Sequence, residues 1–169
     1  MKPYRQFLAL GVSSDGGRVG VEYLVRDFMT APVTGIQQDA RLLDAALVLR
    51  RSGFRHLPIV DGDRLVGIIT DRDIQRFAPS LLGKISQEDY NAIFENTPLE
   101  RVMTRDPATV TPATPVSEAV AILYNKKLGC LPVVEDGRLI GIITITDMLN
   151  LLHRLLAGSE TSQSIAEGL

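Results

Sequence analysis

The chain carries an internal duplication, and this feature limits its fold more than any other. When the sequence is shifted by 74 residues against itself, residues 28–74 lie on residues 102–148 without a gap, and 14 of the 47 aligned positions are identical. Ten of these identities fall in the last 18 aligned positions, where Leu57-Pro58-Ile59-Val60 lies on Leu131-Pro132-Val133-Val134. Both copies also open with Met-Thr, at residues 29–30 and 103–104. The fold must therefore contain the same structural unit twice.

The first half of each copy predicts an extended segment followed by an amphipathic helix. The extended segments are residues 33–36 and 108–110. In the first copy Asp39 is the expected N-cap of the helix, and Gly53 suits the left-handed position at its end. In the second copy Thr114 is the expected N-cap, with Pro115 at the first helical position. The apolar spacing that predicts the two helices is carried by Leu42, Leu43, Ala46 and Leu49, and by Ala119, Ile122 and Leu123.

The second half of each copy predicts a hairpin and a further helix. Asp61-Gly62 and Asp136-Gly137 stand between apolar runs, which is typical of a tight hairpin turn. A helix then begins near Asp71 or Ile145. Each copy is thus a β-α-β-β-α unit of about fifty residues, too small to bury its apolar faces alone. The predicted fold class is α/β, with two tandem repeats packed in pseudo-twofold symmetry.

The strands at residues 66–69 and 140–143 are apolar on both faces. This pattern is expected where helices cover one face and the sister repeat covers the other.

The expected domain organisation follows from the duplication. Residues 1–24 form an N-terminal segment, partly flexible at Ser13–Gly17; residues 25–77 form the first repeat, and residues 99–156 the second. Residues 78–98 form a helical connector, with Ser86 as a helix cap and a capping box at residues 97–100. Residues 157–169 are expected to be a flexible tail.

Composition excludes several functional classes. The net charge of −2 argues against binding to duplex nucleic acid, which needs a basic face, and 5% aromatic residues argue against a stacking platform for single strands. One cysteine, Cys130, rules out a disulfide within the chain and favours a reducing, cytoplasmic location. No apolar run approaches the ~18–20 residues of a membrane span. The sequence contains no recognisable catalytic or metal-binding motif, so no enzyme activity is expected.

Two copies of the pattern Met-Thr, helix, Leu-Pro-Ile/Val-Val, turn, Gly-Ile-Ile-Thr-x-x-Asp resemble the CBS (cystathionine-β-synthase) motif, and together they resemble a Bateman module. The resemblance covers about residues 25–156. It implies two clefts between the repeats, which in the family commonly hold AMP, ADP, ATP, S-adenosylmethionine or related adenosyl ligands. No other cofactor is implied.

The resemblance also implies which residues face each cleft. One cleft would take the end of the first repeat and the start of the second, namely Thr70, Asp71, Arg72, Asp73, Ala108, Val110, Cys130 and Pro132. The other would take Thr144, Thr146, Asp147, Val33, Ile36, Arg55, His56 and Pro58. Asp73 and Asp147 would accept the ribose hydroxyls, while Thr70 and Thr144 would donate to a phosphate. Arg72 in the first cleft, and Arg55 or His56 in the second, would supply positive charge.

Simpler roles remain open for these residues. Asp73 and Asp147 could only cap their helices, since Thr-x-x-Asp is also a capping pattern. The leading expectation is a regulatory module that binds an adenine nucleotide and acts on a partner enzyme or transporter. The alternative is a dimerisation or scaffold module with empty clefts. The family resemblance implies a homodimer, and the apolar helix at residues 148–156 is either part of that interface or packed inside its own chain.

Overall fold

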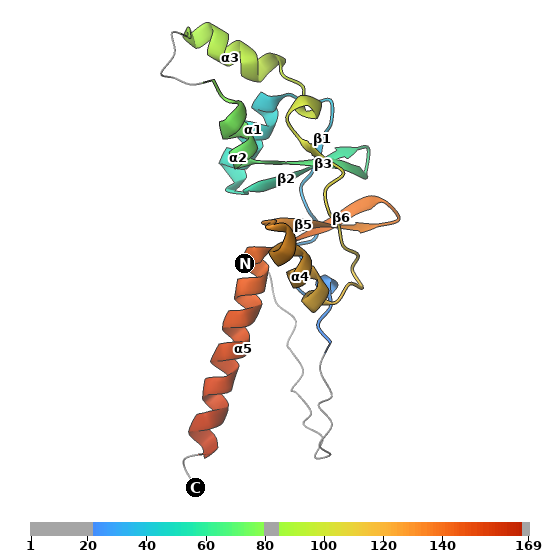
Figure 1. Cartoon of the computed structure of the whole chain (residues 1–169), viewed down its shortest axis with the longest axis vertical. Helices are drawn as coiled ribbons and strands as arrows, with labels where there is room; N and C mark the ends of the chain where they lie inside the picture. The colour runs from blue at the N-terminus through green and yellow to red at the C-terminus, as the bar shows by residue number, and fades with distance from the viewer. Residues whose placement is uncertain (1–21, 80–84, 167–169) are drawn as a thin grey trace.

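The computed structural model describes residues 22–79 and 85–166, with side chains described as far as Ala157. Two similar halves are stacked one above the other, with their β-hairpins in the middle and the helices above and below them (Figure 1). The elements are, in chain order, η1 (Val25–Asp27), β1 (Ile36–Gln37), α1 (Leu42–Ser52), β2 (His56–Asp61), β3 (Arg64–Thr70), α2 (Asp71–Phe77), α3 (Gln87–Asn96), η2 (Leu99–Arg101), β4 (Thr104–Arg105), α4 (Val116–Lys126), β5 (Cys130–Glu135), β6 (Arg138–Thr144) and α5 (Ile145–Ala166).

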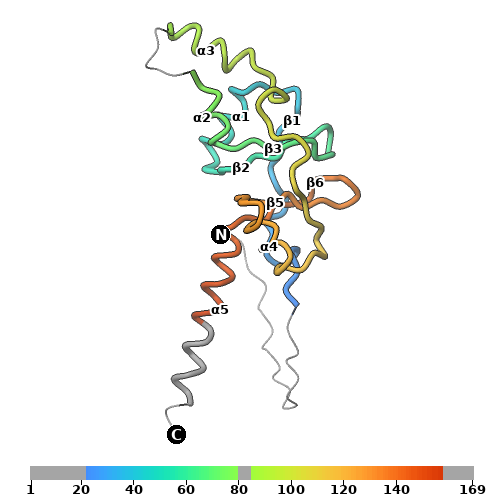
Figure 2. The backbone as a smooth tube through the Cα atoms, viewed as in Figure 1, coloured from blue at the N-terminus to red at the C-terminus, as the bar shows by residue number. Residues whose placement is uncertain are grey.

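The strands confirm the expected α/β repeats and their pseudo-twofold relation. The strand order is β1-β2-β3-β6-β5, with β4 paired to β3. Strands β2 and β3 form one antiparallel hairpin, and β5 and β6 form the other. The hairpins meet where Arg64 pairs with Arg138, two positions that are equivalent under the 74-residue shift. The pseudo-twofold axis therefore passes between the tips of the hairpins. Figure 2 shows the two hairpins one above the other.

The hairpin turns and the end of α1 confirm the local predictions. Gly53 has φ +69°, as expected for a left-handed residue that ends a helix. In the second turn Asp136 and Gly137 both have positive φ, as a type I′ turn requires. The first turn consists of Gly62 and Asp63, and only Gly62 has a positive φ, of +63°, so the two turns differ in type.

Three predicted helix caps are wrong. Helix α1 begins at Leu42 after Arg41, whose amide donates to the Asp44 carboxylate at 2.9 Å, so Asp39 is not the cap. Helix α4 begins at Val116, and the Thr114 hydroxyl accepts a hydrogen bond from the Thr111 amide instead. The predicted capping box at residues 97–100 is a turn of 3-10 helix without a side-chain cap. In contrast, Ser86 caps α3 as predicted, accepting from the Asp89 amide at 3.0 Å.

The start of each repeat crosses over to the other repeat. Thr104 of β4 pairs with Ile68 of β3, and the equivalent Thr30 pairs with Ile142 of β6. These crossings precede the extended segments expected at residues 33–36 and 108–110. Those segments pair with the sheet only at their ends, where Ile36 lies in β1 and Val110 forms a bridge to Val133. The two halves are therefore interlocked by their own chain.

The crossover also exchanges core residues between the repeats. Leu99 and Met103, at the start of the second repeat, lie in the core of the first, and Val25 and Met29 contribute to the core of the second. The first core is completed mainly by α1, β2 and β3, with Leu42, Ala45, Leu49, Leu57, Ile59 and Ile69. The second core contains Val110, Ala119, Leu123, Leu131, Val133 and Ile143.

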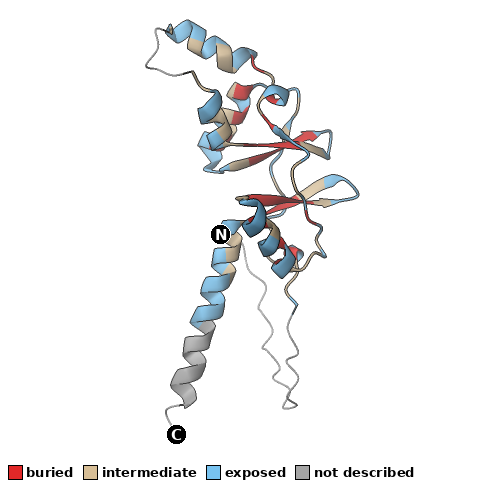
Figure 3. Ribbon diagram, in the orientation of Figure 1, coloured by how far each residue is buried: buried red, intermediate tan, exposed pale blue. Residues whose placement is uncertain are grey.

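The central strands are buried on both faces, as predicted. Ile69 and Ile143 point into the two cores, while the neighbouring Ile68 and Ile142 meet between the repeats with Cys130 and Val33. Figure 3 shows this buried layer along the strands of both halves. Neither hairpin could be covered on both faces without the sister repeat.

Helix α5 continues beyond residue 156, where the second repeat was expected to end, and runs to Ala166. Met148 packs on the second core, but the helix then leaves the body of the molecule, and its side chains up to Ala157 are mostly exposed (Figures 1 and 3). Among the described residues, no helix combines the length and apolar character that crossing a bilayer demands.

Candidate functional site

Thr70 and Asp73 form a tight hydrogen-bonded pair where β3 passes into α2. The Asp73 carboxylate oxygen Oδ2 accepts from the Thr70 amide at 2.9 Å and from the Thr70 hydroxyl at 2.7 Å. The Thr70 hydroxyl oxygen accepts in turn from the Asp73 amide at 3.2 Å. The capping role considered for Asp73 is therefore present in the structure. It uses only one carboxylate oxygen, because within the described residues Oδ1 accepts no hydrogen bond.

The same arrangement recurs where β6 passes into α5. The Asp147 oxygen Oδ2 accepts from the amide and the hydroxyl of Thr144 at 2.8 and 2.7 Å, and the Thr144 hydroxyl accepts from the Asp147 amide at 3.3 Å. Both threonines and both aspartates are half-buried. The duplication thus places two nearly identical Thr–Asp pairs at equivalent positions of the fold, each with a second carboxylate oxygen that can accept hydrogen bonds.

The start of β2 lies beside the first Thr–Asp pair. His56 pairs with Thr70 across the hairpin, and the Arg55 carbonyl accepts from the Asp71 amide at 3.3 Å. The charges of Asp71, Arg55 and Asp73 all act on the His56 imidazole. Arg55 and His56 were expected in the opposite cleft, with Thr144 and Asp147; the structure brings them next to Thr70 and Asp73 of their own repeat.

His56 nevertheless reaches the other repeat. A methyl group built on Gly129 would meet the His56 imidazole, with 2.5 Å to Nε2, so the ring lies directly against the Gly129 backbone. Sequence reasoning did not single out Gly129. The signal was available, because Gly129 is the position equivalent to Arg55, directly before the aligned pair His56 and Cys130.

The second group of residues is arranged in the same way. Cys130 pairs with Thr144 across the hairpin, and the Gly129 carbonyl accepts from the Ile145 amide at 3.0 Å. Val110 donates to the Pro132 carbonyl, so these two residues lie together within the second repeat, as Ile36 and Pro58 lie on neighbouring strands of the first. Val33 contacts the inter-repeat layer of Ile68, Ile142 and Cys130. Ala108 packs on the second core, and Thr146 is exposed at the start of α5.

We define the first site as Thr70, Asp71, Arg72 and Asp73 with Arg55 and His56, and the second site as Thr144, Ile145, Thr146 and Asp147 with Gly129 and Cys130. The two sites are equivalent under the 74-residue shift, position by position. The family model for the CBS domain matches residues 25–80 and residues 92–154, which together cover most of the chain. The chain belongs to the CBS-domain family. It contains two CBS repeats, as the resemblance implied.

Known CBS proteins resemble this chain over most of its length. A CBS domain-containing protein of Dictyostelium discoideum is 33% identical, over 80% of this chain and 95% of its own length. An inosine-5′-monophosphate dehydrogenase of Korarchaeum cryptofilum is 35% identical over 75% of this chain, which spans only 22% of that enzyme. The CBS pair is therefore a small part of some relatives and nearly all of others.

Two solved CBS structures of similar fold contain adenosyl ligands. The CBS domain pair of MJ0100, in complex with 5′-methylthioadenosine and S-adenosyl-L-methionine, is 30% identical, with a TM-score of 0.63 over 77% of this chain and 99% of that chain. CBSX2 in complex with AMP is 27% identical, with a TM-score of 0.66 over 79% of this chain and 98% of that chain.

The environment of His56 in the first CBS repeat makes stability depend on pH. Burial lowers the pKa of His56 below its usual value of 6.5, and the positive charge of Arg55 adds to this effect, while Asp71 and Asp73 oppose it. The folded protein therefore binds this proton less readily than the unfolded chain. We expect the free energy of unfolding to fall as the pH drops below about 6.5, because the unfolded state then gains the proton first.

This pH effect can be measured by urea unfolding between about pH 7.5 and pH 5.5. In His56→Gln, which keeps a polar side chain without titrating, the loss of stability over this range should be smaller than in the wild type. An identical pH dependence in the two proteins would contradict the assignment to His56.

Cys130, at the equivalent position in the second CBS repeat, has a different environment. Burial raises the pKa of the Cys130 thiol to about 12. The side chain is therefore a neutral, apolar group at neutral pH, which fits its packing against Ile68 and Ile142. The two CBS repeats thus place an imidazole and a neutral thiol at matching positions.

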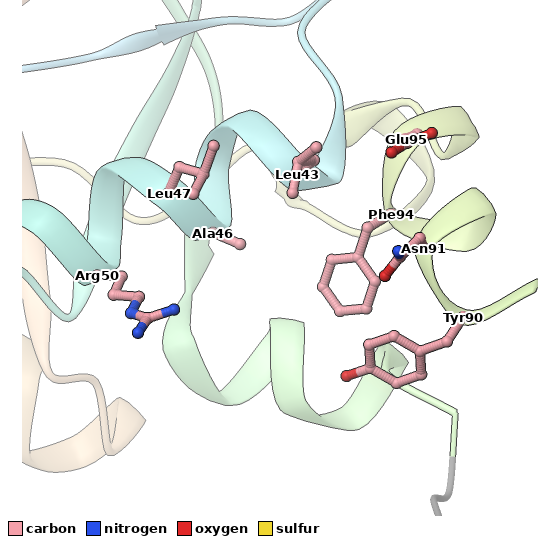
Figure 4. A pocket seen from close by; sticks show the side chains of 8 residues that line it. All are labelled: Leu43, Ala46, Leu47, Arg50, Tyr90, Asn91, Phe94 and Glu95. Atoms are coloured by element: carbon pink, nitrogen blue, oxygen red, sulfur yellow. The ribbon is translucent and has the colours of Figure 1, made fainter. Parts of the chain in front are cut away.

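A separate hollow of about 370 Å³ lies between α1 and the connector helix α3, away from both sites (Figure 4). Its lining comes from these two helices only, namely Leu43, Ala46, Leu47, Arg50, Tyr90, Asn91, Phe94 and Glu95. It contains no part of either Thr-x-x-Asp motif.

Proposed function

We propose that this CBS pair is a regulatory module that binds an adenine nucleotide, such as AMP, ADP or ATP, at its Thr–Asp sites. The single observation that carries the proposal is the doubled Thr–Asp pair, in a fold shared with CBS pairs whose structures contain AMP, 5′-methylthioadenosine or S-adenosylmethionine. No catalytic role is proposed, because in each site the threonine hydroxyl and the aspartate Oδ2 hold one another in the helix cap. The dehydrogenase relative consists mostly of sequence outside the region that matches this chain.

The chemistry of the Thr–Asp pairs suits a ribose. In each site Oδ2 of the aspartate holds the threonine, which fixes the direction of the carboxylate, and Oδ1 is left to accept from a ribose hydroxyl. A hydrogen bond to a charged acceptor is worth about 1.5–3 kcal/mol. The capping role and the binding role are therefore compatible, because they use different oxygens of one carboxylate.

Thermal unfolding with and without nucleotide tests the proposal. At a ligand concentration near 100 times the dissociation constant, binding should add about 2.7 kcal/mol to the free energy of unfolding. We expect AMP, ADP or ATP to raise the melting temperature of the wild type, and the rise to be lost in the double variant Asp73→Ala/Asp147→Ala. Loss of the caps will lower the starting melting temperature of the variant, so the shift on adding ligand is the quantity to compare.

The alternative function is a scaffold whose sites stay empty. In that case none of AMP, ADP, ATP and S-adenosylmethionine should shift the melting temperature. A shift of equal size in the wild type and in the double variant would place nucleotide binding elsewhere, for example in the hollow between α1 and α3.

We also propose that the protein forms a homodimer through its helices. Leu149, Leu152 and Leu155 of α5 are each at least 47% exposed, which is unusual for large apolar side chains on one helix. None of these leucines belongs to a core formed by residues 22–79 and 85–157, and this supports a role in the dimer interface. A change in bound nucleotide could reach a partner enzyme or transporter through such an assembly only if the nucleotide favours one arrangement over another.

Analytical ultracentrifugation tests the dimer. Leu152→Glu places a charge within the apolar face of α5 and should shift the protein towards the monomer, because burial of an unpaired carboxylate is costly. His153→Glu, at an exposed position next to it, is the matched control and should sediment like the wild type. A wild-type protein that is monomeric at all concentrations would refute the dimer.

A further inference from the structure

The two sites differ in charge although their backbones are equivalent. At the positions where the first site has Arg55, Asp71 and Arg72, the second site has Gly129, Ile145 and Thr146. Both sites keep the threonine and the aspartate. With His56 neutral, the first site carries two positive and two negative side chains, whereas Asp147 is the only charged side chain of the second.

The backbone amides at the helix starts do not make up for this difference, because most of them are already used within the chain. The Asp71 and Ile145 amides donate to the Arg55 and Gly129 carbonyls, and the Asp73 and Asp147 amides donate to the threonine hydroxyls. The Arg72 amide donates to the Asp71 carboxylate at 2.9 Å. Recognition of a charged phosphate must therefore come mainly from cationic side chains, which only the first site has.

The two arginines of the first site are available for this task. Arg55 and Arg72 are exposed, and neither forms an ion pair with another described residue. The Arg55 charge lies close enough to act on His56, which itself lies beside Asp71 and Asp73. A guanidinium group forms short, charge-assisted hydrogen bonds to phosphate oxygens.

The second site favours a ligand without a phosphate. Asp147 brings a negative charge that would repel a phosphate, and no cation of this site opposes it. Ile145, at the position of Asp71, is 45% exposed and offers an apolar surface beside the Thr–Asp pair. The neutral Cys130 thiol adds a further apolar group.

We infer that the two sites select different ligands: the first takes a nucleoside phosphate, and the second takes an uncharged adenosine-type nucleoside. This inference rests on the proposed function, because it assumes that both Thr–Asp pairs bind a ribose. It adds that Arg55 and Arg72 set the specificity of the first site, and that the protein can report on two chemically distinct adenosyl compounds at once.

Isothermal titration calorimetry with AMP and with adenosine tests the inference. We expect one strong AMP site per chain. Arg55→Ala/Arg72→Ala should weaken it about tenfold or more, which corresponds to losing one good charge-assisted contact. The same variant should leave adenosine binding at the second site unchanged, and Asp147→Asn should remove that adenosine site while keeping AMP binding. Arg76→Ala, an exposed arginine on the same helix α2, is the matched control and should bind AMP like the wild type.

A gain of function gives a second readout. Thr146→Arg places a guanidinium at the position equivalent to Arg72, and it should create AMP binding at the second site, raising the number of AMP molecules bound per chain.

The inference fails if AMP and adenosine fill both sites equally, or if AMP binding survives Arg55→Ala/Arg72→Ala and is lost in Asp147→Asn. In these cases the proposed function would stand, because adenosyl ligands still bind. If neither AMP nor adenosine binds to the wild-type protein, the proposed function and the inference fail together.

Discussion

Replacement of Leu99 by alanine should lower the free energy of unfolding by about 2–5 kcal/mol. Leu99 begins the second repeat in the sequence, but its side chain is fully buried in the core of the first, beside Leu42, Ile69 and Met103. Truncation removes apolar contacts and leaves a cavity that the interlocked chain cannot easily close. Urea unfolding at a fixed protein concentration measures the loss.

The matched control for this change is Arg101→Ala. Arg101 lies in the same short helix η2 but is exposed, so its replacement should change the free energy of unfolding by no more than about 0.5 kcal/mol. If Leu99→Ala is as stable as Arg101→Ala, the start of the second repeat does not pack into the core of the first repeat. That result would contradict the exchange of first segments between the repeats.

Replacement of Gly67 by alanine should destabilise the protein by about 1–3 kcal/mol. Here the crossing strand β4 passes over β3 so closely that no side chain fits between them. A methyl group on Gly67 would lie 2.5 Å from the Met103 sulfur and 3.1 Å from the Thr104 carbonyl oxygen. The thioether can move only into a filled core, and the carbonyl belongs to the backbone, so strain is unavoidable. Thermal or urea unfolding gives the size of the effect.

Gly35→Ala is the control for Gly67→Ala. A methyl group on Gly35 would meet its nearest neighbours at 3.4–3.5 Å, which is ordinary contact. This variant should unfold like the wild type. The position equivalent to Gly67 offers a repeat of the experiment, because a methyl group on Gly141 would lie 2.9 Å from the Met29 sulfur and 3.1 Å from the Thr30 carbonyl oxygen. Tolerance of alanine at both glycines would contradict the close crossing of the two strands.

Much of the candidate site could be read from the sequence, and the reason is local. Thr-x-x-Asp at the start of a helix fixes its own geometry, because the hydroxyl, the amides and the carboxylate satisfy one another within four residues. The duplication then supplied the second copy. The placement of His56 could not be read in this way, since its neighbours Thr70 and Gly129 are reached only across the hairpin and across the gap between repeats.

The helix caps show the limits of local patterns. Asp39 and Thr114 are good capping residues by type, yet α1 and α4 begin two or more residues later. Backbone contacts to distant segments decide where α1 starts: the Leu42 amide donates to the Thr97 carbonyl at 2.9 Å. Likewise, the Val116 amide at the start of α4 donates to the Tyr23 carbonyl at 2.8 Å. Such partners are remote in sequence and leave no local signal.

The sequence by itself determined that this protein is a doubled α/β unit with a Thr–Asp pair after strand β3 and another after strand β6. The duplication is visible in the sequence directly, and the hairpin turns and capping motifs are each encoded by residues close in the chain. Only the tertiary structure decided that the repeats exchange their first segments. As a result, Leu99 of the second repeat lies in the core of the first, and Val25 of the first repeat lies in the core of the second. It also decided which side chains stand beside each aspartate. The physical reason is that burial on both faces of a central strand needs a partner from another part of the chain, and apolar patterning shows the need for that partner without showing which segment supplies it.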